Sequence, residues 1–174
     1  MKKIIYGVIA ILLIAGGVIF ALNSKDNYNP DKYFAKATNG LNVGSKINLK
    51  LPDQFNNTTT LKDDTKKLIF AFSKNTGHIT REFFSKQPKE FLDSKKALLV
   101  ADISKMPVFI RNTFAMPDLK KSPYKILLIY DKNLAKEFEK GIDKDKVIVV
   151  TLNNKEVTKV DYAKNKEELE KLLK

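Results

Sequence analysis

The sequence predicts an α/β fold in which a central mixed sheet has helices on both faces and is preceded by one N-terminal transmembrane helix. Three observations lead to this prediction. A long uncharged run follows MKK, three continuous apolar runs have the length of buried strands, and amphipathic helical segments alternate with those runs. Hydrophobic residues make up 43% of the 174-residue chain and charged residues 30%, a composition typical of a folded domain.

The first element is the apolar run IIYGVIAILLIAGGVIFAL at residues 4–22, nineteen positions without a charged group. As a helix it would be about 28 Å long, close to the hydrocarbon thickness of a bilayer. The positive-inside rule keeps Lys2 and Lys3 in the cytoplasm and places the following chain on the far side. A cleaved signal peptide is the alternative, but the run is longer than a usual signal core, and the residues around Ala21 make a poor cleavage site. We therefore expect residues 1–22 to be an uncleaved, single-pass anchor that makes the cytoplasmic membrane a partner.

Residues 23–43, NSKDNYNPDKYFAKATNGLNV, mix Asn, Lys, Asp and Pro without a sustained hydrophobic period. Such a segment predicts a tether between the membrane and a folded domain. The domain is then expected to span residues 44–174. With the membrane orientation above, it would lie on the periplasmic side of the cell inner membrane.

The strands of the domain are predicted from apolar runs and turn residues. The run LIFAFS is continuously apolar and the runs ALLVADI and KILLIYD are mainly apolar, as expected for strands buried on both faces. Asn153 and Asn154 suit the type I′ turn of a hairpin near the C-terminus. The expected strands cover residues 47–51, 58–61, 68–73, 97–103, 125–131, 146–152 and 155–162.

The helices are predicted from apolar residues at helical spacing. One kinked or two short helices follow His78, interrupted by Pro88, and a short helix has Pro107 at its first turn and Pro117 at its end. Two more helices are NLAKEFEK and the C-terminal NKEELEKLLK, in which Asn165 can act as the cap. The order β-β, β-α-β-α-β-α, β-β-α implies a sheet that is parallel in its middle.

The absence of certain residue types limits the kinds of catalytic and metal-binding site that the chain can form. The chain has no Cys, which excludes disulfides, thiol catalysis, iron–sulfur clusters and Cys-bound zinc. A single His cannot form a His cluster, and no carboxylate cluster suggests a metal site. There is also no Gly-rich phosphate loop and no Ser-His-Asp arrangement. We expect no cofactor and no metal.

The net charge of +12 comes almost entirely from lysine, since Arg81 and Arg111 are the only arginines. Nucleic-acid readers rely on Arg for bidentate contacts with bases and phosphates. The lysines are interleaved with acidic residues, as in KEFEKGIDKDK, and form no stripe. We expect a solvated surface and no nucleic-acid partner, with a weak attraction to anionic lipid headgroups or acidic envelope polymers as the alternative.

Three stretches in the same order carry a resemblance to a known family: VGSKINLKLPDQFNNTTTLKD, LIYDKNLAKEF and VIVVTLNNKEVTKVDYAKNKEELEKLL. Together they resemble the thioredoxin-like superfamily in its peroxiredoxin (AhpC/TSA-like) branch and, more narrowly, small periplasmic proteins of the YtfJ kind. The resemblance covers about residues 43–174. It implies a thioredoxin-like fold for the whole domain.

The resemblance also implies where redox chemistry would be placed, at the junction between a strand and a helix within FAFSKNTGHITREFF. In the peroxiredoxin spacing, Thr76, Ile79 and Glu82 stand at the motif positions, so an isoleucine takes the place of the nucleophile. In the thioredoxin spacing, Asn75 and His78 take the places of the cysteine pair. The proline that the family carries before the VIVVTL strand is replaced around residues 145–146. The resemblance therefore implies that the scaffold is kept and that the redox chemistry is lost.

The candidate site is what remains of that junction: Asn75, Thr76, Gly77, His78, Ile79, Arg81 and Glu82. Thr76, the N–H groups of residues 77–80 and Arg81 could bind an anion, or Thr76 could simply cap a helix. His78 could be a general base, but without a nucleophile we expect it to face solvent or to cap. Arg111, among apolar neighbours, is expected to extend from an apolar face towards solvent.

Two functions follow from these observations. The first is a membrane-anchored periplasmic thioredoxin-like protein without redox cysteines, which binds a protein or another envelope component and catalyses no reaction. The alternative is a non-thiol enzyme or anionic-ligand-binding protein that uses the loop from Asn75 to Arg81.

Overall fold

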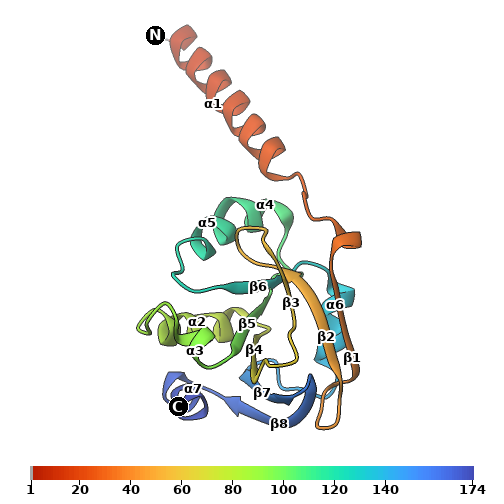
Figure 1. Cartoon of the computed structure of the whole chain (residues 1–174). Helices are drawn as coiled ribbons and strands as arrows, with labels where there is room; N and C mark the ends of the chain where they lie inside the picture. The colour runs from red at the N-terminus through yellow and green to blue at the C-terminus, as the bar shows by residue number, and fades with distance from the viewer. Residues whose placement is uncertain (1) are drawn as a thin grey trace.

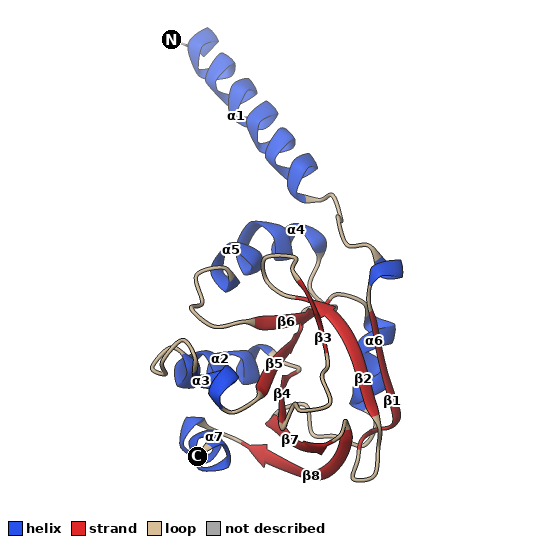
Figure 2. Cartoon of the chain, viewed as in Figure 1, coloured by secondary structure: helices blue, strands red, loops and turns tan. Residues whose placement is uncertain are grey.

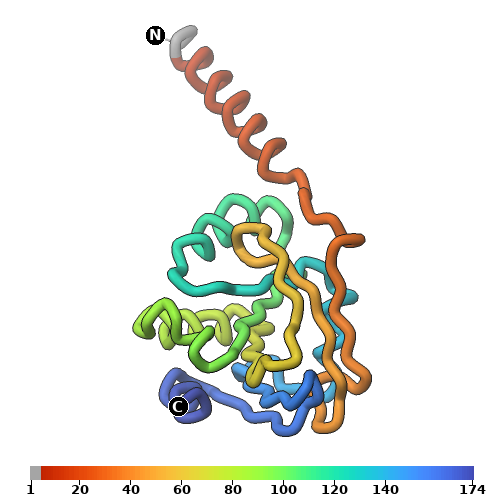
Figure 3. The backbone as a smooth tube through the Cα atoms, in the orientation of Figure 1, coloured from red at the N-terminus to blue at the C-terminus, as the bar shows by residue number. Residues whose placement is uncertain are grey.

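The computed structural model describes residues 2–174 and shows one long helix leaving an α/β domain (Figure 1). Helix α1 runs from Lys2 to Asn23, and its segment Ile5–Asn23 is 19 residues long, uncharged and entirely unburied. This helix is long and apolar enough to span a membrane. The C-terminus lies at the end of the domain away from α1 (Figure 3).

The chain between α1 and the domain is shorter than the sequence predicts. A 3₁₀ turn, η1 (Pro30–Lys32), leads into strand β1 (Phe34–Leu41), which pairs antiparallel with β2 (Ile47–Pro52). The expected tether of residues 23–43 is therefore wrong from residue 34 onwards. Most β1 side chains are at least partly exposed while its backbone pairs with β2, so a polar sequence forms a strand here without an apolar pattern.

Two sheets form the domain (Figure 2). The small sheet is antiparallel, in the order β1-β2-β3, with β3 at Thr58–Thr60. The large sheet has the order β6-β5-β4-β7-β8, parallel from β4 to β6 and antiparallel from β4 through β7 to β8. The predicted mixed sheet is confirmed. Its strands are β4 (Lys67–Ala71), β5 (Ala97–Asp102), β6 (Ile126–Ile129), β7 (Val147–Asn153) and β8 (Glu156–Ala163).

Helices and the small sheet cover the two faces of the large sheet. Phe70 of β4 belongs to a core with Phe138 and the small sheet, while neighbouring Ile69 belongs to a second core with Phe84 and Leu169. Alternation along a continuously apolar strand thus supplies two cores. The helices are α2 (Lys74–Phe84), α3 (Phe91–Ser94), α4 (Val108–Ile110), α5 (Met116–Leu119), α6 (Lys132–Glu139) and α7 (Lys166–Leu173).

Two local predictions need correction. Pro117 does not end its helix, because a π turn, η2 (Arg111–Ala115), precedes it and the helix continues as α5. The wider turn makes room for the proline ring, which would otherwise clash with a carbonyl in the turn before it. The hairpin turn is one residue later than expected, at Asn154 and Lys155, whose φ angles are 47° and 66°. The pairing of buried Leu152 with buried Val157 sets that register.

Candidate functional site

The first turns of α2, where the sequence places the candidate site, are occupied by a capping box. Ser73 Oγ accepts the Thr76 N–H at 3.3 Å, and Thr76 Oγ1 accepts the Ser73 N–H at 2.9 Å. Thr76 is fully buried, and its hydroxyl donates to the Ser73 carbonyl at 2.9 Å. Ser73 is therefore the helix cap, and the expectation that Thr76 caps is wrong. The hydroxyls that begin this helix are used within the helix itself.

The groups needed for an anion site on α2 already have partners. The Gly77 N–H donates to the Ser73 carbonyl at 2.9 Å, and the N–H groups of residues 78–80 lie inside the helix, facing carbonyls four residues earlier. The Arg81 guanidinium is paired with both carboxylate oxygens of Asp118. The free N–H groups that the anion interpretation requires are thus not present.

The other residues of the predicted site do not share one environment, since some are buried in the core and others are exposed. Ile79 is buried in the second core, whereas Asn75 and His78 are exposed. The Glu82 carboxylate lies 3.4 Å from Lys166 Nζ on α7. Before β7, Lys146 Nζ pairs with the Asp143 carboxylate at 2.8 Å, at the place where the resemblance puts a proline. The structure therefore does not gather the seven predicted residues around one reacting centre.

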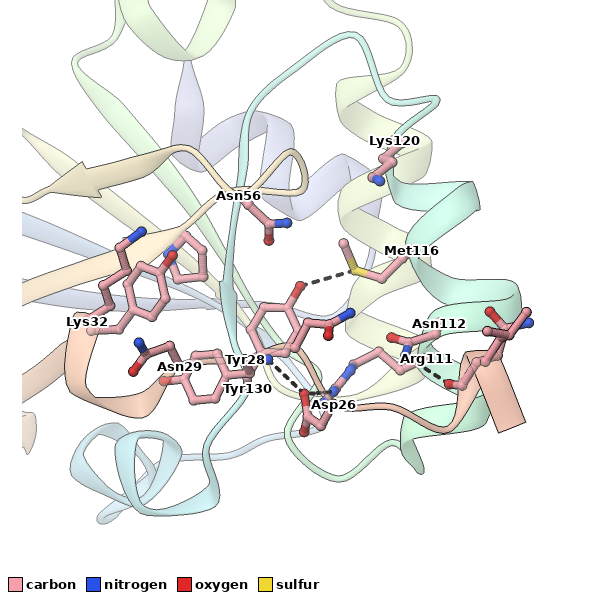
Figure 4. Close-up of a pocket in the computed structure, with 15 residues that line it drawn as sticks. Asp26, Tyr28, Asn29, Lys32, Asn56, Arg111, Asn112, Met116, Lys120 and Tyr130 are labelled. Atoms are coloured by element: carbon pink, nitrogen blue, oxygen red, sulfur yellow. Dashed lines mark hydrogen bonds and ion pairs between the residues drawn. The ribbon is translucent and has the colours of Figure 1, made fainter. Parts of the chain in front are cut away.

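A pocket that the sequence did not predict lies where α1 meets the domain (Figure 4). Its volume is about 480 Å³. The chain following α1 forms one wall, and the segment from η2 to α5 with the end of β6 forms another. The lining is mostly polar: asparagines 23, 27, 29, 56 and 112, tyrosines 28, 33 and 130, and the cationic Lys32, Arg111 and Lys120.

Arg111 is the buried charge of this pocket, with 3% of its surface exposed. Its Nη2 donates to Asp26 Oδ1 at 2.6 Å, and its guanidinium carbon lies 4.7 Å from the centre of the Tyr130 ring. The expectation that this side chain extends towards solvent is wrong. Arg111 opens the π turn η2, which directs its side chain onto the chain that follows α1.

The Asp26 carboxylate is tuned by this contact. Its partial burial raises the pKa, but the hydrogen bonds from Arg111 and from the Tyr28 N–H, together with the Arg111 charge, lower the pKa further, so the net shift is downward. Asp26 is thus a stable anion beside a buried cation. The pair joins two parts of the chain that are 85 residues apart.

Three tyrosines stack beside the ion pair. The Tyr28 ring lies 5.6 Å from that of Tyr33 and 5.0 Å from that of Tyr130, with interplanar angles of 15° and 12°. The Tyr130 hydroxyl donates to Met116 Sδ at 3.4 Å. Among the described residues, the buried Tyr28 hydroxyl and Arg111 Nε have no hydrogen-bond partner. The pocket therefore has an aromatic wall, behind which two polar atoms are buried without a partner.

Replacing Tyr28 by Phe should leave the free energy of unfolding at neutral pH within about 0.5 kcal/mol of wild type, because the hydroxyl that is lost has no partner. Burial, followed by nearby Asp131, raises the pKa of Tyr28 to about 12. The neutral phenol therefore contributes stability that is complete below about pH 10 and is lost as the pH rises towards 12.

Chemical denaturation of the full chain in detergent, from neutral to alkaline pH, measures both effects. Tyr28→Phe should lose less stability than wild type in the alkaline range, while Tyr6→Phe, on the unburied α1, serves as the matched control. Part of the alkaline loss should remain, because burial also raises the pKa of Tyr124 and of Tyr130. A large loss for Tyr28→Phe at neutral pH, or an unchanged alkaline decline, would contradict this interpretation.

The comparisons with known proteins support the fold. No protein-family model and no curated protein matches the chain. The solved structures include a protein from Bacteroides thetaiotaomicron proposed to be a disulfide isomerase, with a TM-score of 0.51, 15% identity, and coverage of 80% of this chain and 89% of that one.

Two further solved structures are similar to a lesser degree. An uncharacterised thioredoxin-like protein from Porphyromonas gingivalis has a TM-score of 0.46 and 16% identity, covering 71% of this chain and 86% of its own. The thioredoxin domain of a thiol-disulfide oxidoreductase from Bacteroides vulgatus has a TM-score of 0.46 and 13% identity, covering 76% and 99%. The present chain thus has a thioredoxin-like fold, and it carries no cysteine with which to perform thiol chemistry.

Proposed function

We propose that this protein is a membrane-anchored, non-catalytic binding module on the periplasmic side of the inner membrane, which recognises an envelope component through the pocket beside α1. The observation that carries this proposal is the distribution of polar groups. At the start of α2 the hydroxyls and N–H groups bond to one another, whereas the pocket presents exposed amides and lysines and a stack of tyrosines held beside the buried Arg111.

The lining of the pocket indicates the kind of ligand. The exposed amides of Asn27 and Asn56 offer both donors and acceptors, and Lys32 and Lys120 are exposed cations at the pocket wall. Tyrosine rings provide flat apolar area with a polar edge. A site of this composition suits a polar ligand with an acidic group, held by hydrogen bonds and by a ring stacked on an aromatic surface. Cationic groups at the wall would also attract acidic polymers from solution.

The proposal places the domain outside the cytoplasm, which a pair of reporters fused after Lys174 tests in cells. A reporter that folds only after export should be active, and one that works only in the cytoplasm should be inactive. Deleting residues 4–22 should reverse both results, because that deletion removes the only apolar span of the described chain. Activity of the cytoplasmic reporter on the intact chain would refute the proposed orientation.

A further inference from the structure

We infer that the helical segment α4-η2-α5 forms a second membrane contact, with its exposed apolar face lying in the lipid interface beside α1. This inference rests on the proposed membrane anchoring and adds the position of the domain on the bilayer. The face consists of Pro107, Ile110, Phe114 and Pro117, which we call the interface stripe.

The first observation fixes the depth of this segment. The Phe20 ring of α1 lies 5.0 Å from the Phe109 ring, centre to centre. Phe20 stands three residues before the end of α1 at Asn23, or about 4.5 Å inside it at 1.5 Å per residue. The contact therefore lies within the apolar length of α1. If α1 spans the bilayer, Phe109 must lie at the boundary of the hydrocarbon layer, because no tether separates the two rings.

The second observation is that hydrogen bonds and an ion pair hold this segment against the chain that follows α1. The Asn112 side-chain amide donates to the backbone carbonyls of Asn23 at 2.9 Å and of Lys25 at 3.0 Å. One residue earlier, Arg111 holds Asp26. These bonds tie the π turn to the chain that leaves the membrane helix. Figure 1 shows α4 and α5 at the end of the domain from which α1 departs.

The third observation is the character of the interface stripe. Its members are spaced by three, four and three residues, so they lie along one helical face. Ile110 is 44% exposed and Phe114 61% exposed. In water such an apolar face is uncovered, but at a lipid boundary it is buried to a depth of about 5–10 Å.

The residues that follow the interface stripe also favour a lipid bilayer as the surface that covers it. Lys120 and Lys121 are exposed where α5 ends, as expected for side chains that reach anionic headgroups. A protein partner could bind anywhere on the domain, so it would not explain why the interface stripe lies beside α1. A lipid surface explains this position, because an α1 that spans the bilayer places the boundary of the hydrocarbon layer next to Phe20. Continuity with the membrane helix therefore favours the bilayer as the occupant of the stripe.

Tryptophan fluorescence tests the inference directly, because the chain has no native Trp. Three single variants of the full chain are compared in vesicles of phosphatidylcholine and phosphatidylglycerol, with and without bromine on the upper acyl chains. Phe114→Trp reports the stripe, Phe20→Trp reports the anchor, and Tyr162→Trp reports exposed β8. Ile110→Trp is a second stripe variant in case the first does not fold.

We expect brominated lipid to quench Phe114→Trp and Ile110→Trp to a degree approaching that of Phe20→Trp, and to leave Tyr162→Trp unchanged. If Phe20→Trp is quenched while both stripe variants behave like Tyr162→Trp, the inference is wrong and the anchor stands. If Phe20→Trp is not quenched either, the proposed anchoring fails and the inference fails with it.

Discussion

Arg111→Ala should lower the free energy of unfolding of the full chain by about 3 kcal/mol. The largest part of the loss comes from the desolvated contact of the guanidinium with the Tyr130 ring, and a further part from the space left by a side chain that is 3% exposed. The ion pair adds little to the loss, since the Asp26 side chain is 46% exposed and solvent screens it.

Arg111→Met is the matched control, because it keeps most of the volume and removes the charge. It should recover most of the packing and lose the acid dependence. In wild type the Asp26 pKa is lowered, so the contact contributes stability above the ordinary carboxyl pKa and loses it as pH falls through the lowered value. Denaturation from about pH 6 to about pH 3 measures this difference. A full-strength acid decline in Arg111→Met would show that Asp26 is stabilised by other groups.

Gln54→Ala should destabilise the chain by about 3 kcal/mol, because it leaves two buried backbone groups without partners. Gln54 is 1% exposed, its Nε2 donates to the Tyr124 carbonyl at 2.8 Å, and its Oε1 accepts the Ile126 N–H at 2.9 Å. The side chain thus bonds to the outer edge of β6 as a neighbouring strand would. It also joins β6 to the turn after β2, and this part of the chain contributes Pro52, at the end of β2, and Asn56, in the turn, to the pocket wall.

The same denaturation experiment provides a control in the same turn. Asn57→Ala removes one hydrogen bond, from its exposed Nδ2 to Asp53 Oδ2 at 3.2 Å, and should change stability by about 0.5 kcal/mol or less. If Gln54→Ala costs no more than Asn57→Ala, the backbone groups of Tyr124 and Ile126 find other partners, and the bridging role assigned to Gln54 is incorrect.

The sheet was predictable because its central strands are continuously apolar, and neighbours such as Ile69 and Phe70 fill cores on opposite faces. Strand β1 was not predictable in this way, since backbone pairing with β2 maintains it while most of its side chains remain accessible. The π turn was missed for a related reason. Sequence spacing predicts a helix up to Pro117, but the extra residue that makes room for the proline ring leaves no mark in the apolar spacing.

The candidate site was the least predictable part of the molecule. The loop after β4 resembles a redox site in sequence, but its polar groups are occupied by local hydrogen bonds between Ser73 and Thr76. The pocket brings together Asp26, Arg111 and Tyr130, which are far apart in the sequence and share no pattern. The one available signal was the rarity of arginine, since Arg111 is one of only two arginines among 32 basic residues.

In-cell photo-crosslinking tests most directly whether binding takes place at the pocket beside α1. A photoreactive residue replaces Lys32 at the pocket wall in one full-length variant and Lys74 at the start of α2 in another; both positions are exposed. The position 32 variant should give a discrete adduct in native membranes that is lost on adding Arg111→Met, and the position 74 variant should give none. An adduct from position 74 alone, or one from position 32 that persists with Arg111→Met, would contradict the account.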